Sequence, residues 1–183
     1  MRVFFYIFVF ALIGCKEPKP RRPVTTKTGT FFKESAARNQ KIRALEEVAI
    51  KKSIAADSLN TYYTSTDGFW YCYGIKDTLN NYTPQKNDVV LVAYSIKTLD
   101  NTPIYTKEQI GIIQFKIDGE TAFPGLNTGL KLMKKGEIVH FLFPSYLAYG
   151  YHGDGNNIGI NVPLKSTVSL IDIVEIANDR SPN

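Results

Sequence analysis

Residues 143–155, FPSYLAYGYHGDG, gather polar and aromatic side chains that could take part in chemistry. The single His and Asp of this stretch, His152 and Asp154, have no obvious partner for acid–base catalysis, and we expect both to be solvent-exposed turn residues. Ser145 stands in F-P-S-Y-L rather than in the G-x-S-x-G pattern of an activated serine. The glycines match neither the Walker nor the Rossmann spacing for phosphate binding. This stretch therefore lacks the residue patterns needed for covalent catalysis, acid–base catalysis or phosphate binding.

Metal and thiol chemistry find little more support. His140, His152 and Cys72 show no metal-ligand spacing in the part of the chain that we expect to fold. The alternation of EIVHFLF places His140 on a strand face as a solvated or hydrogen-bonded side chain. Cys72 lies among aromatic residues, where we expect a small buried apolar side chain. The sequence therefore predicts neither a bound metal nor a cofactor.

One reaction requires none of these groups. Rotation about an X–Pro peptide bond is slow because amide resonance has to be broken, with a barrier of ~18–20 kcal/mol. A dry aromatic site favours the less polar twisted amide, and one hydrogen-bond donor can hold its carbonyl. An enzyme of this kind would display aromatic side chains and a tyrosine hydroxyl, which matches residues 143–150.

The elements that would position these side chains form an α+β pattern. One short helix is expected at residues 124–133, because Pro124 suits a helix start and Leu126, Leu130 and Met133 share one side. Around it lie segments rich in β-branched and aromatic residues, separated by turn residues. We predict a curved antiparallel β-sheet wrapped over this helix and preceded by a helical stalk. The expected strands are residues 69–74, 89–96, 111–117, 137–143 and 166–176.

The N-terminal segment predicts export and lipidation. An apolar run at residues 3–13 follows a basic start, and it is too short to span a bilayer, which takes ~20 residues, but suits a signal peptide. The run leads into LIGC, which resembles the lipobox of bacterial lipoproteins, so we expect residues 1–14 to be removed and Cys15 to carry lipid. The alternative is an ordinary secretory signal with an incidental cysteine. With Cys15 lipidated, Cys72 has no disulfide partner.

Two further segments precede the folded domain. Residues 15–32, with the lipidated cysteine and many Pro, Thr and basic residues, should be a flexible tether. Residues 33–66 should be a helical stalk, in which apolar residues recur every seven positions and Lys52 interrupts them. A helix lying on its own domain and a homodimer through residues 33–60 both fit this spacing.

The charged residues are distributed differently on the two sides of the boundary between residues 66 and 67. Residues 16–66 hold 11 Lys or Arg against 5 Asp or Glu, whereas residues 67–183 hold 10 against 12. A basic segment beside a lipid anchor fits an anionic membrane surface rather than nucleic acid, for which no motif is present. We therefore expect a membrane partner and no nucleic-acid partner.

From about Asn87 to Ile176 the sequence resembles the FKBP-type peptidyl-prolyl cis-trans isomerases. The motifs VAYSIKTLDNTPIY, AFPGLNTGLKLMKKGE, FPSYLAYG and NVPLKST follow the order and spacing of that family. The resemblance implies an FKBP-like isomerase domain over residues 67–178, with proline-containing polypeptides as clients and no cofactor.

A narrower resemblance joins the lipobox, the basic stalk, GFWYCYGIKDTLNNYTP and YLAYGYHGDGNNIG. Together they look like the gliding-motility-associated lipoprotein isomerases of gliding bacteria. This implies an enzyme that assists the folding of exported or envelope proteins, including those of a gliding apparatus. It also implies a position on the periplasmic face of a bacterial membrane, the outer rather than the inner one.

The site residues carry over from the FKBP motifs. Tyr149 matches the tyrosine whose hydroxyl can bind the substrate carbonyl, and Phe123 matches the residue that offers its backbone N–H. Leu126 lies at the start of the central helix as the floor. Together with Tyr94 and Tyr105 these make up the predicted catalytic set. The predicted substrate-binding residues are Ile104, Ile113, Ala122, Val162 and Leu170.

Two positions depart from the family. Ile104-Tyr105 stands where the family commonly has Phe-Asp, so the carboxylate is missing, and Leu126 stands where tryptophan is common. Two hypotheses therefore stay open. The first is an isomerase, the second a weakly active or inactive FKBP-like binding or chaperone module of an envelope machine.

Overall fold

A computed structural model describes residues 28–119 and 121–174. The predicted signal peptide (residues 1–14), Cys15, the first part of the tether and residues 175–178 of the predicted domain lie outside these. The chain forms two compact units, residues 1–36 and 37–183. The boundary falls within helix α2 (Thr28–Ala55), so the C-terminal part of that helix belongs to the same unit as the sheet. Among the described residues, α2 and the shorter helices all lack an apolar stretch long enough to cross a bilayer.

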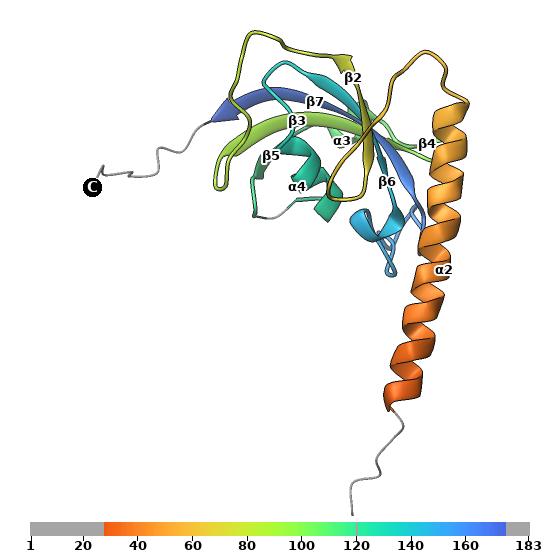
Figure 1. The fold of residues 1–183 in the computed structure, drawn as a ribbon. Coiled ribbons are helices and arrows are strands. Elements are labelled where there is room, and N and C mark those ends of the chain that lie inside the picture. The colour runs from red at the N-terminus through yellow and green to blue at the C-terminus, as the bar shows by residue number, and fades with distance from the viewer. Residues whose placement is uncertain (1–27, 120, 175–183) are drawn as a thin grey trace, which may run out of the picture. The chain divides into compact units, whose positions relative to one another are not determined.

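Within the described residues, seven strands form one sheet. They are β1 (Tyr63–Thr64), β2 (Trp70–Ile75), β3 (Val89–Lys97), β4 (Pro103–Tyr105), β5 (Ile112–Lys116), β6 (Ile138–Phe143) and β7 (Leu164–Val174). Their order is β1-β2-β6-β7-β3-β4, with β5 also beside β3, and every pairing is antiparallel. The sheet arches over a short helix (Figure 1). The predicted α+β class is confirmed.

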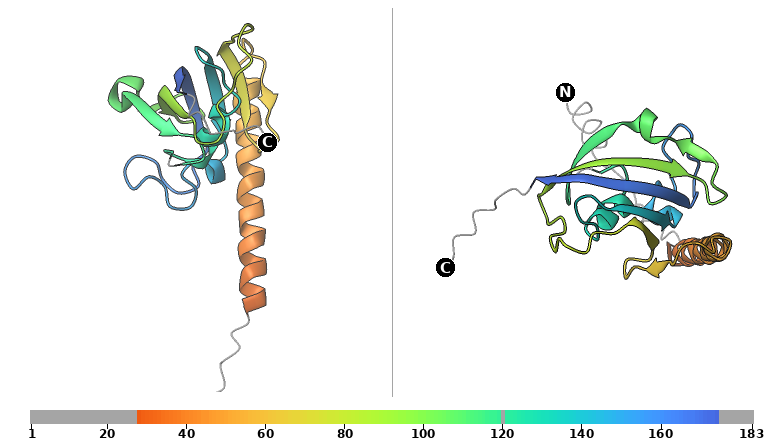
Figure 2. Two further views of the ribbon diagram at one scale, coloured as in Figure 1. Left: turned by 90° about the vertical axis from the view of Figure 1, so that its left-hand side faces the viewer. Right: turned by 90° about the horizontal axis from the view of Figure 1, so that it is seen from above.

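That short helix is α4 (Pro124–Leu130), with proline in its first turn and Leu126 and Leu130 fully buried against the sheet. Gly125 lets α4 approach closely, because a Cβ at this position would lie 2.6 Å from Cδ1 of Phe143 and 2.7 Å from the carbonyl oxygen of Leu147. Figure 2 shows α4 against the concave side of the twisted sheet from two further directions. The helix ends three residues earlier than the predicted 124–133, and Lys131 and Leu132 form a turn.

The prediction of a single helix inside the domain was wrong. A helical turn, α3 (Lys107–Ile110), lies between β4 and β5, and a 3-10 turn, η1 (Ser145–Leu147), follows β6. Thr106 caps α3, because its hydroxyl accepts from the backbone N–H of Gln109, while the Gln109 side chain accepts from the N–H of Thr106. This turn splits one sheet edge into two short strands, and Tyr105 is the last residue of the first.

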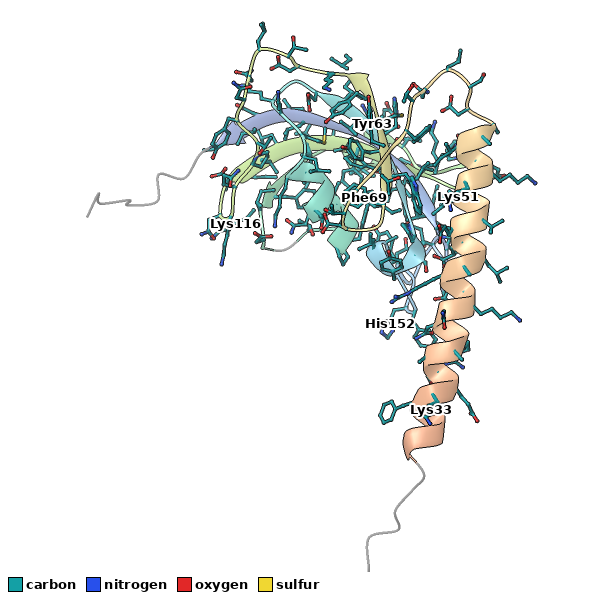
Figure 3. The ribbon with its side chains drawn as sticks, viewed as in Figure 1. Lys33, Lys51, Tyr63, Phe69, Lys116 and His152 are labelled. Carbon is teal, nitrogen blue, oxygen red and sulfur yellow. The ribbon has the colours of Figure 1, made fainter. Side chains whose placement is uncertain are left out.

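The core is aromatic. Phe69 lies beneath the sheet (Figure 3), with its ring centre 5.3 Å from that of Phe143 and 5.7 Å from that of Phe141.

Two minor predictions are confirmed. Cys72 is buried, and Nδ1 of His140 is 2.9 Å from the hydroxyl of Thr167.

The C-terminal half of α2 packs on its own domain. Ile50 is fully buried, and the hydroxyl of Ser53 donates to the carbonyl oxygen of Leu99 at 3.0 Å. Lys51 points away on the exposed side of the helix (Figure 3), where it pairs with Glu47 at 2.7 Å. For this half of the helix, the alternative of a helix lying on its own domain is confirmed. A homodimer through residues 33–60 stays a prediction.

Candidate functional site

The central strands bring one set of predicted site residues together. On β3, Val92 is paired with Leu170 of β7 on one side and with Ile113 of β5 on the other. Directly paired residues of neighbouring strands share a face, so Leu170 and Ile113 lie on the face that Val92 buries. Tyr94, two residues further along β3, lies on the same face, and its ring centre is 6.3 Å from that of Phe115.

The second set lies where α4 begins and where η1 ends. Phe123 immediately precedes α4 in an extended conformation. Its ring centre is 5.4 Å from that of Tyr149 and 5.4 Å from that of Phe143. Leu126, the predicted floor, is fully buried in the first turn of α4.

All the predicted site residues belong to one continuous apolar cluster, and they differ in depth. The buried ones form a floor beneath a half-buried rim, an arrangement that offers a surface able to take an apolar ligand group. The floor consists of Tyr94, Phe123, Leu126 and Leu170, and the rim of Ile104, Tyr105, Ile113, Ala122, Tyr149 and Val162.

Three hydrogen-bond donors at this site remain available to a ligand. Among the described residues, neither the hydroxyl of Tyr94 nor that of Tyr149 bonds to another group. No buried side-chain nitrogen or oxygen of the described residues lacks a partner, so both hydroxyls must reach the surface. The backbone N–H of Phe123 likewise has no partner in the described part of the chain. These three donors and the apolar floor make a place where an amide carbonyl can be held.

The tyrosines are neutral donors at physiological pH. Burial, followed by the nearby Tyr94, Asp154 and Tyr105, raises the pKa of Tyr149 to about 12. Burial also raises the pKa of Tyr94 above its ordinary value. Both hydroxyls therefore keep their protons, as donation to a carbonyl requires.

Asp154 is a member of the candidate site that the sequence did not predict. The hydroxyl of Tyr105 donates to Oδ2 of Asp154 at 2.5 Å across 49 residues, and Asp154 is half-buried. The expectation that Asp154 is only a solvent-exposed turn residue was therefore wrong, whereas His152 is exposed as expected. The sequence D-G-N shows that Asp154 belongs to a turn, but no local pattern indicates which residue it meets across the fold. Ile158, in the segment N-N-I-G-I, was also missed and is 3% exposed in the core.

Metal ligation finds no support in the geometry. In residues 28–119 and 121–174, no three His, Cys, Asp or Glu side chains converge on a common point.

Comparison with known proteins fits this geometry. The sequence profile of a family described as FKBP-type peptidyl-prolyl cis-trans isomerase matches residues 80–171, half of the chain. A curated relative, the probable FKBP-type peptidyl-prolyl cis-trans isomerase FkpA of Neisseria meningitidis serogroup B, is 30% identical over 128 residues. The match covers 69% of this chain but 44% of that relative, so the chain spans less than half of its length.

Solved structures share the fold. A peptidyl-prolyl cis-trans isomerase from Pseudomonas syringae pv. tomato superposes with a TM-score of 0.61 at 20% identity, over 74% of this chain and 96% of that one. FkpA from Escherichia coli gives a TM-score of 0.60 at 23% identity, over 95% of this chain and 82% of that one. The profile match, the curated relative and the fold agree, and the chain belongs to the FKBP-type peptidyl-prolyl cis-trans isomerase family.

Proposed function

We propose that this chain catalyses cis–trans rotation about X–Pro bonds in polypeptide clients. The observation that carries the proposal is a set of three donors that have no partner among the described residues, above a buried apolar floor. They are the hydroxyls of Tyr94 and Tyr149 and the N–H of Phe123. The related proteins from Neisseria meningitidis and Pseudomonas syringae are named as peptidyl-prolyl cis-trans isomerases, which supports the same activity.

The chemistry follows from the state that rotation must pass through. When an X–Pro amide twists by ninety degrees it loses its resonance, its nitrogen becomes pyramidal and it becomes less polar. An apolar floor that includes Phe123 and Leu126 would accept the proline ring and favour the less polar twisted form. Tyr149, held neutral, would donate to the carbonyl while the bond rotates. Neither a proton transfer nor a covalent intermediate is required.

The alternative is an FKBP-like binding or chaperone module that has little catalysis. One observation favours it, because Tyr105 occupies the position at which the family resemblance leads one to expect a carboxylate. The arrangement of available donors favours the isomerase, and we adopt that as the conclusion. Slow proline steps take tens of seconds or more without a catalyst, so the two functions differ measurably.

An exchange experiment on short X–Pro peptides tests the activity. The chain from residue 15 onward, carrying Cys15→Ser to prevent lipidation, would be added to peptides while NMR follows cis-to-trans exchange. We expect acceleration, which Tyr149→Phe and Phe123→Ala should reduce. No acceleration at micromolar enzyme would leave only the binding module. A rate unchanged in both variants would mean that the site lies elsewhere.

We also propose that lipid on Cys15 anchors the chain to the periplasmic face of a bacterial membrane, the outer rather than the inner one. The apolar run of residues 3–13, the LIGC sequence and the basic residues that follow support this. Labelling with a radioactive fatty acid and fractionating the membranes is the test. A Cys15→Ser variant should lose both the label and the membrane association, and a variant that stays membrane-bound would contradict the anchor.

We propose a role in the folding of exported or envelope proteins, including those of a gliding apparatus. Only the narrower sequence resemblance supports the gliding role. Deleting the gene from its own bacterium and measuring spreading on a surface is the test, with complementation by the wild-type chain and by Tyr149→Phe. Normal spreading of the deletion strain would refute the gliding role and leave the isomerase proposal intact.

A further inference from the structure

A folded flap, defined here as residues 150–163, follows the turn that carries Tyr149. Its shape depends on Gly153, which has a positive φ of 67° and whose Cβ, if present, would lie 2.3 Å from the carbonyl oxygen of Ile158. The N–H of Asp154 donates to that same carbonyl at 3.0 Å, and the N–H of Asn161 donates to the carbonyl of Gly150 at 2.8 Å. The flap is therefore closed on itself, which fixes the position of Asp154.

The carboxylate of Asp154 is held by several hydrogen-bond donors and by no cation of the described residues. Oδ1 accepts from the N–H of Asn156 at 2.9 Å and from that of Ile158 at 2.8 Å, and Oδ2 accepts from the hydroxyl of Tyr105. Burial alone would raise the pKa of Asp154, but the hydrogen bonds from Tyr105, Ile158 and Asn156 outweigh it and hold the pKa below its usual value. Asp154 takes part in none of the ion pairs of the described residues. An ionised carboxylate without a neutralising partner thus occupies the flap.

This charge acts on the site. Tyr105, which donates to this carboxylate, and Tyr149, whose pKa the carboxylate helps to raise, both belong to the half-buried rim. Of the groups that raise the pKa of Tyr149, Asp154 alone is charged at neutral pH, because the other two are tyrosines. A substrate bound at Tyr149 would therefore lie within the field of one negative charge.

We propose that Asp154 determines the charge preference of this isomerase, favouring clients with a basic residue next to the proline over clients with an acidic one. The proposal rests on the isomerase activity proposed above. It is carried by the position of an unneutralised carboxylate, fixed by Tyr105 and by the flap backbone, at the rim of the site. The interaction of a single half-exposed charge with a charged substrate side chain is worth on the order of a three- to tenfold difference in kcat/KM between the two substrates.

The test compares three capped peptides that differ only in the residue before proline, which is Lys, Gln or Glu. For the chain from residue 15 onward that carries Cys15→Ser, we expect kcat/KM to be highest for the Lys peptide, lower for the Gln peptide and lowest for the Glu peptide. Asp154→Asn keeps the shape and removes the charge, and it should bring the Lys-to-Glu ratio close to one. Glu47→Gln is the matched control, because it removes one negative charge from an exposed pair with Lys51 and should keep the wild-type ratio.

Salt offers a second test that needs no variant. Raising the salt concentration from ~0.01 M to ~1 M shortens the Debye length from about 30 Å to about 3 Å and should shrink the wild-type ratio. A wild-type ratio near one, a ratio that salt leaves unchanged, or a wild-type ratio in Asp154→Asn would each overturn the proposal. The Gln peptide distinguishes a failure of the charge preference from a failure of the isomerase activity. If it is accelerated without any charge preference, only this proposal fails, and if none of the peptides is accelerated, the isomerase activity fails and this proposal with it.

Discussion

The carboxylate of Glu46 accepts two hydrogen bonds from Ser145, one from its backbone N–H at 2.8 Å and one from its hydroxyl at 2.6 Å. The two residues are 99 positions apart, and both are buried. The carbonyl of Ser145 in turn accepts from the N–H groups of Ala148 and Gly150, which flank Tyr149. One carboxylate of α2 therefore supports the turn that carries a predicted catalytic residue.

Glu46→Ala should destabilise the domain by about 2–4 kcal/mol, because it leaves the N–H and the hydroxyl of Ser145 buried without a partner. It should also lower kcat/KM by loosening the turn that carries Tyr149. Urea unfolding and the peptide exchange assay measure the two effects. Glu47→Ala, on the exposed side of the same helix, should change stability by no more than about 0.5 kcal/mol. Equal losses in the two variants would contradict a specific role for Glu46.

Tyr149 should make stability depend on alkaline pH. Its pKa is raised from 10.0 to about 12 in the folded chain, so the folded state keeps a proton that the unfolded state releases. The stability from this shift is complete below pH ~10 and is lost as the pH rises towards ~12. Tyr149→Phe should therefore lose less unfolding free energy than the wild type between about pH 9 and about pH 11. The same loss in both would argue against the raised pKa.

Tyr105→Phe should loosen the flap. Removing a hydroxyl that donates to an ionised carboxylate should cost about 1–2 kcal/mol of unfolding free energy. Hydrogen exchange at the amides of Asn156 and Ile158 should quicken, because Asp154 would lose one of its anchors. Tyr62→Phe is the matched control, since it removes a comparable bond to Asp57 of 2.9 Å outside the flap. Slower exchange in the flap of Tyr105→Phe than in that of Tyr62→Phe would be the opposite of what this geometry predicts.

Gly125→Ala should be poorly tolerated. A Cβ would lie 2.6 Å from the Phe143 ring and 2.7 Å from a backbone oxygen that cannot move freely, so α4 must shift. We expect a loss of about 1–3 kcal/mol, seen as a lower melting temperature. Gly159→Ala is the control, because its nearest neighbour lies at an ordinary 3.8 Å. A Gly125→Ala variant as stable as the control would show that α4 can withdraw without cost.

Two short elements that were not predicted, α3 and η1, do have local sequence signals. Thr106 and Gln109 have the spacing of a capping box, which identifies the start of α3 even though four residues are too few for a helical period. Pro144, between β6 and the 3-10 turn η1, is likewise a local signal for the end of that strand. The five predicted strands agree with β2, β3, β5, β6 and β7 to within two residues at each described end, because strand ends depend on pairing rather than on composition alone. The short strands β1 and β4 lie outside every predicted range.

The sequence by itself determined five of the seven strands of the described residues, the start of α4 at Pro124 and the burial of Leu126, because alternation and proline geometry act within a few residues. Its resemblance to the FKBP family also predicts Tyr94, Phe123 and Tyr149 as site residues. Only the tertiary structure decided that Asp154 meets Tyr105 and that Glu46 meets Ser145. It also decided that the hydroxyls of Tyr94 and Tyr149 have no partner among the described residues. These facts depend on which polar groups the fold brings together across 49 or 99 residues, and a hydrogen bond at that separation leaves no pattern in the local sequence.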